Sequence, residues 1–196
     1  MNTLQRLITI GLLLLTPVLV QGATWDLDVD HTNLQFKVKH LMISNVKGKF
    51  NSFSGNLTTQ GDDLSTGKLA VTIQVDSVDT DNQKRDDHLR SPDFFDATNH
   101  PTMTFVSKTI AAKGDKVESI SGDLTIRGVT REVTLEIEDQ SPTIVGPWGK
   151  TRRGATATTT IDRRDYGLLW NKTLDTGGLV VGNDVKITLE VELIKR

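Results

Sequence analysis

The sequence predicts an all-β protein, and three observations lead to that fold class. Apolar and polar residues alternate with period two in several stretches, which is typical of half-buried antiparallel strands. Turn signals such as Gly114-Asp115 and Gly182-Asn183-Asp184 separate these stretches. Only residues 85–91 have a helical pattern, which extends over one or two turns and carries little apolar surface. The chain therefore has no crossover helices of the kind that parallel sheets need.

Four alternating stretches carry the strand prediction. Each places apolar side chains on one face and polar side chains on the other. They lie at 34–39, 71–75, 132–138 and 185–193. A hairpin is predicted where the strands 124–126 and 133–137 flank the turn residues 127–130.

About eight strands without crossover helices can form either a sandwich or a closed barrel. The stretch 154–160 offers only small side chains on both of its faces. In a barrel of ~8 strands such a stretch leaves an internal space for one small ligand. In a sandwich it thins a core that is normally close-packed, unless large neighbours such as Phe36 or Phe105 fill the gap. Periodicity alone leaves the choice between the two architectures open, and also which face of 154–160 points inward.

The first residues predict export. Arg6 precedes an apolar run from Leu7 to Val20, and small residues follow at Gly22 and Ala23. This is the pattern of a cleavable signal peptide, and the uninterrupted run is short of the ~20 apolar residues that a spanning helix needs. We expect a signal peptide at 1–22, with cleavage after Gly22 or, as second choice, after Ala23. A single domain at 23–196 would then be located in the periplasm.

Composition excludes several classes of function. The chain has no cysteine, which excludes disulfides, thiolate zinc sites and catalytic thiols. Its net charge of -2 offers no field for nucleic acid. The four histidines lack metal-ligand spacing, and no Gly-x-Ser-x-Gly elbow occurs. We therefore expect no catalytic residues, no metal, no cofactor and no stable membrane insertion.

A set of short segments occurs in order along almost the whole predicted mature chain. They are Trp25-Asp26-Leu27-Asp28, Asp30-His31-Thr32, 36–41, 46–50, Phe53-Ser54-Gly55, 77–80, 85–91, Asp93-Phe94-Phe95-Asp96, His100-Pro101, Thr104-Phe105, 124–130 and Arg164-Asp165-Tyr166-Gly167. This ordered set resembles the YceI family of polyisoprenoid-binding periplasmic proteins. The resemblance implies a lipocalin-like, antiparallel closed β-barrel of about eight strands with a long apolar tunnel. It also implies a bound isoprenoid, such as a quinone or polyprenyl-phosphate tail, or a similar amphiphile.

Bulky apolar residues and one small strand residue are the candidates for the tunnel lining; a bulky one taken alone more often fills a core, but an apolar tunnel needs a set of these residue types. They are Phe36, Val38, Phe50, Phe53, Val71, Ile73, Phe94, Phe95, Met103, Phe105, Ala157 and Trp170. Phe94 and Phe95 are adjacent, so in an extended segment at most one of them faces the tunnel. Arg85, His88 and Arg90 are the candidates for meeting a polar head group, the alternative being a solvated turn whose arginines pair with Asp86 and Asp87.

The predicted function is binding, storage or transport of a long-chain isoprenoid lipid. One alternative is an enzyme acting on such a lipid, for example a hydrolase that uses Asp86, Asp87 and His88. A second alternative is a stress-response structural protein with a small cavity. The sequence leaves open which lipid is native, whether it is delivered to a membrane protein, and whether the barrel forms a homodimer.

Overall fold

The structure, a computed structural model, describes residues 22–61, 63–173 and 178–196. Within these ranges the strands are β1 (Gly22–Leu27), β2 (Asn33–His40), β3 (Ser44–Phe50), β4 (Phe53–Gln60), β5 (Asp63–Gln74), β6 (Val78–Asp79), β7 (Thr102–Lys113), β8 (Lys116–Ile126), β9 (Val129–Gln140), β10 (Ile144–Val145), β11 (Thr151–Asp162) and β12 (Val181–Lys195). The helices of these ranges are η1 (Val75–Ser77), α1 (Gln83–Arg90) and η2 (Arg163–Tyr166). Residues 1–21 of the predicted signal peptide lie outside the described residues.

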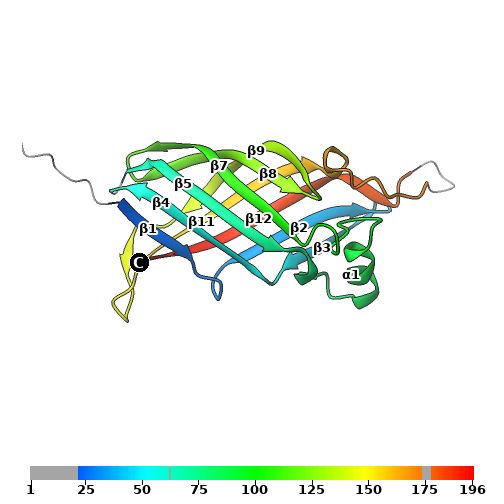
Figure 1. The fold of residues 1–196 in the computed structure, drawn as a ribbon, viewed down its shortest axis with the longest axis horizontal. Helices are drawn as coiled ribbons and strands as arrows, with labels where there is room; N and C mark the ends of the chain where they lie inside the picture. The colour runs from blue at the N-terminus through cyan, green and yellow to red at the C-terminus, as the bar shows by residue number, and fades with distance from the viewer. Residues whose placement is uncertain (1–21, 62, 174–177) are drawn as a thin grey trace, which may run out of the picture.

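The strands form one antiparallel sheet that closes on itself (Figure 1). Its neighbours run in the order β11, β9, β8, β7, β5, β4, β1 and β12. Pairing between β11 and β12, from Arg152 opposite Ile194 to Asp162 opposite Asp184, joins the two ends of this series. The result is an eight-stranded barrel, so the predicted closed barrel is confirmed and the sandwich is excluded.

At two positions in the barrel wall, two consecutive strands separated by a turn take the place of one long strand. β12 pairs with β2 over its first part and with β1 near its end. β3 and β4 continue the wall in the same way, because β3 pairs with β2 and β4 with β1. At the break between β1 and β2, the Asp28 carboxylate accepts hydrogen bonds from the Asp30 N–H at 3.2 Å and the His31 ring at 2.9 Å. An aspartate that binds its own backbone in this way favours a turn.

The predicted hairpin is present as β8 and β9. Ile126 pairs with Val129 across a turn in which Arg127 and Gly128 have φ values of 51° and 74°. Two successive positive φ angles are what a tight hairpin turn requires. The turn predicted at 182–184 is wrong, since these residues lie inside β12. The pairing of β12 with β2 shifts register there, so the glycine and its polar neighbours form an irregularity within a strand.

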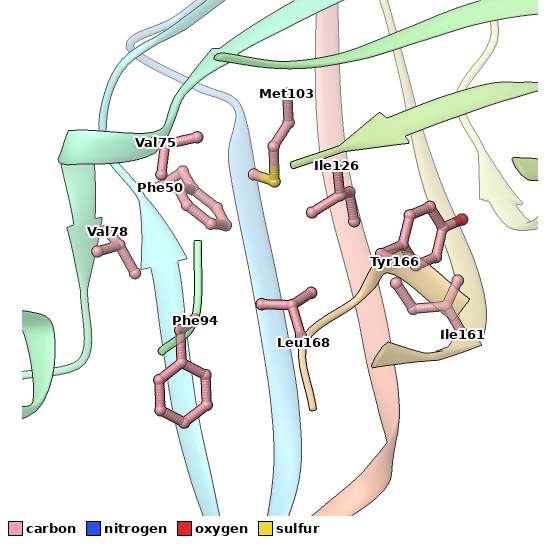
Figure 2. Packing of buried hydrophobic residues seen from close by; sticks show 9 residues of the cluster. All are labelled: Phe50, Val75, Val78, Phe94, Met103, Ile126, Ile161, Tyr166 and Leu168. Carbon is pink, nitrogen blue, oxygen red and sulfur yellow. The ribbon is translucent and has the colours of Figure 1, made fainter. Parts of the chain in front are cut away.

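One end of the barrel holds a large apolar cluster, and we call it the helix end because α1 lies there (Figure 1). Figure 2 shows the buried members of the cluster converging from several strands and from the segments after α1 and β11. They are Phe50, Val75, Val78, Phe94, Met103, Ile126, Ile161, Tyr166 and Leu168. Six of them, Phe50, Phe94, Met103, Ile126, Ile161 and Leu168, also line the cavity described below, so the cluster forms this end of the cavity wall.

The short helix α1 matches the prediction of helical turns at 85–91, beginning two residues earlier. Asn82 caps it, because its side-chain oxygen accepts a hydrogen bond from the Arg85 N–H at 3.1 Å. The Arg90 guanidinium donates to the carbonyls of Asp76 and Val78 at 2.8 and 2.9 Å, which ties the helix to η1 and β6. No helix in the described ranges is long and apolar enough to cross a membrane.

The opposite end of the barrel, which we call the Trp25 end, has a second and smaller cluster. Its buried members are Ala23, Trp25, Leu57, Leu64 and Ile110. Figure 1 places the start of β1 and the C-terminus of the chain at this end. A third cluster, with the buried members Phe105, Leu135 and Ala157, connects the two ends, because Leu69 packs against it and against the Trp25-end cluster and Leu124 packs against it and against the helix-end cluster.

Candidate functional site

The barrel encloses an elongated apolar cavity of about 280 Å³. It is lined by residues of β1, β2, β3, β4, β5, β7, β8, β9, β11 and β12, and α1 contributes Leu89. The volume is close to the lower end of the ~300–1,000 Å³ typical of small-molecule sites. A slender chain therefore suits this space better than a bulky ligand does.

The small residues of β11 explain why space remains in the middle of the barrel. Ala155, Ala157 and Thr159 line the cavity, whereas Thr156 and Thr158 do not. The sequence left open which face of 154–160 points inward, and the structure shows that it is the face with Ala155 and Ala157. Across the β11–β12 pair, Ala157 lies opposite the large Leu189, so a small residue and a large residue share this level of the barrel. A larger residue at 157 would project directly into the cavity.

Ten of the twelve residues predicted to line the tunnel do line this cavity. They are Phe36, Val38, Phe50, Val71, Ile73, Phe94, Phe95, Met103, Phe105 and Ala157. The expectation that only one of Phe94 and Phe95 faces the cavity is wrong, because residues 91–95 form turns rather than an extended strand. Contact of these side chains with a lipid remains a prediction.

Phe53 and Trp170 do not contribute to the cavity lining. Phe53 is half-buried at the start of β4, opposite Ile73. Trp170 packs outside the lining, with its ring 5.2 Å from that of Phe94 and 4.8 Å from that of His88. Sequence reasoning also missed an aliphatic row on β12, namely Val185, Ile187, Leu189, Val191 and Leu193. The same alternation of apolar and polar residues that predicted the strand at 185–193 also identifies these five residues as one apolar face.

The three residues predicted to meet a head group lie away from the cavity lining. Arg85 donates to the hydroxyl and the carbonyl of Thr80, both at 2.7 Å. His88 bonds Asp93 at 2.9 Å, and Arg90 holds backbone carbonyls as described above. Their polar groups therefore hold α1 and the segments around it in place. Arg90 also donates a hydrogen bond to Asp87, as the alternative of a solvated turn with paired arginines and aspartates predicted.

The acidic and imidazole groups of α1 do not converge on a common point. Asp86 is buried and accepts hydrogen bonds from the N–H and hydroxyl of Thr80. Asp87 is exposed and accepts from Gln83 and Arg90, while His88 bonds Asp93. General acid–base catalysis needs groups positioned around one reacting atom. This arrangement offers no such position in the described structure.

Apart from Gln35 and Thr159, the polar side chains of the cavity lining lie at its two ends. Arg163, at the helix end, is buried and donates to the carbonyls of Leu168, Trp170 and Gly182, with distances of 3.0 Å to Trp170 and 2.9 Å to Gly182. Burial lowers the pKa of Arg163, and the Asp162 carboxylate opposes that effect. Three carbonyl acceptors satisfy this guanidinium, so it serves to hold the segments at the helix end in place.

At the Trp25 end, Gln140 and Arg153 line the cavity. Between Ile137 and Gln140, β9 has one residue more than β11 has between Ala157 and Ala155, and this bulge turns Gln140 inward. Its side-chain oxygen accepts a hydrogen bond from the Val117 N–H at 3.0 Å, and its amide nitrogen donates to the Asp115 carbonyl. Gln140 therefore fixes the β7–β8 turn beside the cavity.

A second hollow of about 480 Å³ lies on the outer side of β11, next to the Trp25 end of the cavity. His31 and Glu192 line it, and together with the buried Asp28 they bring three potential metal-ligand atoms within 4.8 Å of one another. Arg152 donates hydrogen bonds to both carboxylates of this group. The Arg152 guanidinium therefore supplies the positive charge that balances the Asp28 and Glu192 carboxylates.

The family model of YceI-like domains matches residues 25–193. The chain is 39% identical over 168 residues to a UPF0312 protein of Staphylococcus epidermidis, an alignment that covers 86% of this chain and 95% of the relative. A UPF0312 protein of Staphylococcus aureus is 39% identical over 167 residues, covering 84% and 94%.

Solved structures share the barrel, and two of them show the range of sequence identity. A YCEI protein of Campylobacter jejuni is 34% identical, with a TM-score of 0.66, and the match covers 82% of this chain and 91% of that one. A polyisoprenoid binding domain from Saccharophagus degradans matches with a TM-score of 0.65 at 18% identity, covering 88% and 98%, and shows a common fold. The family match spans almost the whole barrel, and sequence identity to the relatives extends over the same range. The chain belongs to the family of YceI-like domains.

Proposed function

We propose that this protein binds a long-chain isoprenoid lipid, or a similar amphiphile, with its tail in the barrel cavity. The observation that carries the proposal is a closed barrel whose interior is lined almost entirely by apolar side chains and is left unfilled along β11. Each methylene transferred from water into such a space contributes about 0.8 kcal/mol. A long chain thus gains enough free energy to leave water or exchange with a membrane.

The fold supports this proposal. The Saccharophagus degradans domain with the same fold is described as polyisoprenoid binding, so a barrel of this kind can hold such a chain. The finer part of the proposal is that the protein is exported through its N-terminal signal and stores or carries the lipid in the periplasm. That location rests on the sequence pattern of residues 1–22. Intact-mass measurement of periplasmic protein, which we expect to begin at Ala23 or Thr24, tests this point.

The direct test compares two substitutions on adjacent residues of β11. We expect Ala157→Phe to fill the cavity and abolish lipid that co-purifies with the protein, identified by solvent extraction and mass spectrometry. Thr158→Phe places the same ring on the outer face and should leave the lipid content unchanged. Ala157→Phe should cost little stability, because its ring enters space that the lipid had occupied.

Other results contradict the proposal in distinct ways. Overpacking of a filled core would cost Ala157→Phe about 1–3 kcal/mol in urea unfolding. That loss, or equal lipid content in both variants, would show that no ligand chain runs past this strand. A lipid recovered in hydrolysed form would instead favour the enzyme alternative.

A further inference from the structure

Arg153 is placed where the apolar lining ends. On β11 it shares the inward face with Ala155 and Ala157, and it lines the cavity together with them. Arg163, the first residue of η2 directly after β11, lines the other end of the cavity, about 33 Å away at a rise of ~3.3 Å per residue along the strand. The small-residue face of β11 is thus bracketed by two guanidinium groups.

The guanidinium of Arg153 is sparsely used by the protein. Among the described residues it makes one hydrogen bond, a long one of 3.3 Å from Nη2 to the Asp115 carbonyl. It also lies over the buried Trp25 ring at 5.8 Å, where Lys195 approaches the same ring at 5.5 Å. A guanidinium has five N–H donors in a planar fork that matches carboxylate and phosphate groups. Most of that capacity is available to a ligand.

The charges around Arg153 favour an anion at this point. Burial lowers the pKa of Arg153, and the Asp115 carboxylate, the acidic group that acts on it, only partly opposes this effect. Arg153 makes no ion pair among the described residues. A half-buried cation without an ionic partner is stabilised by any acidic group that reaches it.

The site also adjoins the hollow on the outer side of β11. Arg153, Gln140, Gly154, Ala155 and Val191 line both the internal cavity and the outer hollow. A ligand with its tail in the cavity can therefore place its head beside Arg153 and close to the surface. By contrast, the neighbouring Arg152 points outward, and Asp28 and Glu192 already bind it.

We propose that Arg153 binds the head group of the lipid and that the cavity therefore selects long-chain anions, either phosphates or carboxylates, over neutral lipids of similar tail. This inference rests on the proposed function, since it assigns the head group of the same ligand. Arg85, His88 and Arg90, at the opposite end of the barrel, have no part in it.

The test measures binding of three probes to the full mature protein after its lipid has been removed. The probes are geranylgeranyl phosphate, the neutral alcohol geranylgeraniol, and oleate, with affinities taken from isothermal titration calorimetry. We expect the wild type to bind at least one of the two acids about tenfold or more tighter than the alcohol, which is the size of effect that a charge-assisted hydrogen bond produces. A preference for phosphate alone identifies a phosphate head, and a preference for both identifies acidic heads in general.

Three variants make the assignment specific. Arg153→Gln should lower the affinity for the acid to that for the alcohol and leave the alcohol unchanged. Arg153→Lys, which keeps the charge but loses the fork, should retain part of the preference and serves if the glutamine variant folds poorly. Arg164→Gln is the matched control, because Arg164 is exposed and paired with Asp162 on the surface. It removes the same charge and should leave all three affinities unchanged.

The failures of the two proposals are distinguishable. Equal binding of the acids and the alcohol by the wild type, or full retention of the preference in Arg153→Gln, would overturn the role of Arg153 and leave lipid binding intact. No binding of any probe by the wild type would overturn the proposed function itself.

Discussion

The two arginines that bracket the cavity have the same chemistry but different surroundings. Arg163 at the helix end is 5% exposed and gives its donors to three backbone carbonyls. Arg153 at the Trp25 end is half-buried and donates one long hydrogen bond. The comparison teaches that a charged residue facing a barrel interior can either hold the segments of the barrel in place or remain available to a ligand. The number of protein acceptors around it decides which.

The largest expected effect is a difference in the free energy of unfolding between a variant of the structural Arg163 and a variant of the ligand-binding Arg153. Arg163→Met should lower the free energy of unfolding by about 3 kcal/mol or more, because it removes the guanidinium donors from one buried and two partly buried carbonyls. Arg153→Met should change it by less than about 1 kcal/mol, since little of its bonding is to protein. Urea unfolding of the lipid-free proteins measures both values. Similar losses in the two variants would mean that Arg153 is also a structural residue.

A smaller effect is expected for the ion pairs on the outer face of the barrel, beside Arg153. Burial raises the pKa of Asp28, but hydrogen bonds from Arg152, His31 and the Asp30 N–H outweigh it, so the net pKa is lowered. A lowered pKa in the folded state contributes stability above the ordinary value of 3.8, and this contribution is lost as the pH falls through the folded value. Asp28→Asn should therefore be less stable than the wild type at neutral pH by about 1–3 kcal/mol.

Unfolding at a series of pH values measures the difference between Asp28→Asn and the wild type. The difference should shrink toward zero as the pH falls below 3.8. Asp139→Asn, which removes a carboxylate from the outer hollow near Asp28, serves as the control for net charge. A difference for Asp28→Asn that stays constant down to the acid limit would show that its ion pair with Arg152 does not contribute to stability.

The smallest effect concerns the helix end. Tyr166 is 1% exposed, and its hydroxyl has no hydrogen-bond partner among the described residues. Burial raises the pKa of Tyr166 to about 12, assisted by the charge of Asp165. Tyr166→Phe removes a desolvated hydroxyl and should leave stability unchanged or raise it by up to about 1 kcal/mol. A loss of more than about 1 kcal/mol in the thermal or urea transition would reveal a partner for this hydroxyl.

The strands could be predicted from the sequence because one-sided burial leaves a period-two pattern, as in the β12 row from Val185 to Leu193. Closure of the barrel could not be derived from that pattern. It depends on pairing between β11 and β12 and on breaks between β1 and β2, which bring distant segments together. The irregularity at Gly182 shows the same limit, because a glycine-rich segment suits a bulge as well as a turn.

The candidate site was predictable in its apolar part and not in its polar part. Large apolar residues on the inward faces of the strands line the cavity, and their prediction does not depend on which end of the barrel holds the head group. The choice of Arg85, His88 and Arg90 required knowing whether these side chains line the cavity, and that is set by tertiary packing around α1. The alternation that identifies Ala155 and Ala157 as one face also includes Arg153, but the sequence alone does not show that this face points inward.

Photo-crosslinking tests the central claim, that a lipid tail occupies the cavity and extends toward the helix end, most directly. Two isoprenoid phosphates, one with a diazirine at the end of the tail and one with a diazirine next to the head, are bound to the wild type and irradiated. Mass spectrometry then locates the modified residues. We predict that the tail probe modifies residues of the helix end, such as Ile161 or Leu168, and that the head probe modifies residues near Arg153, such as Val117 or Leu193. Modification confined to exposed surface residues, or the reverse order of the two probes, would contradict the account.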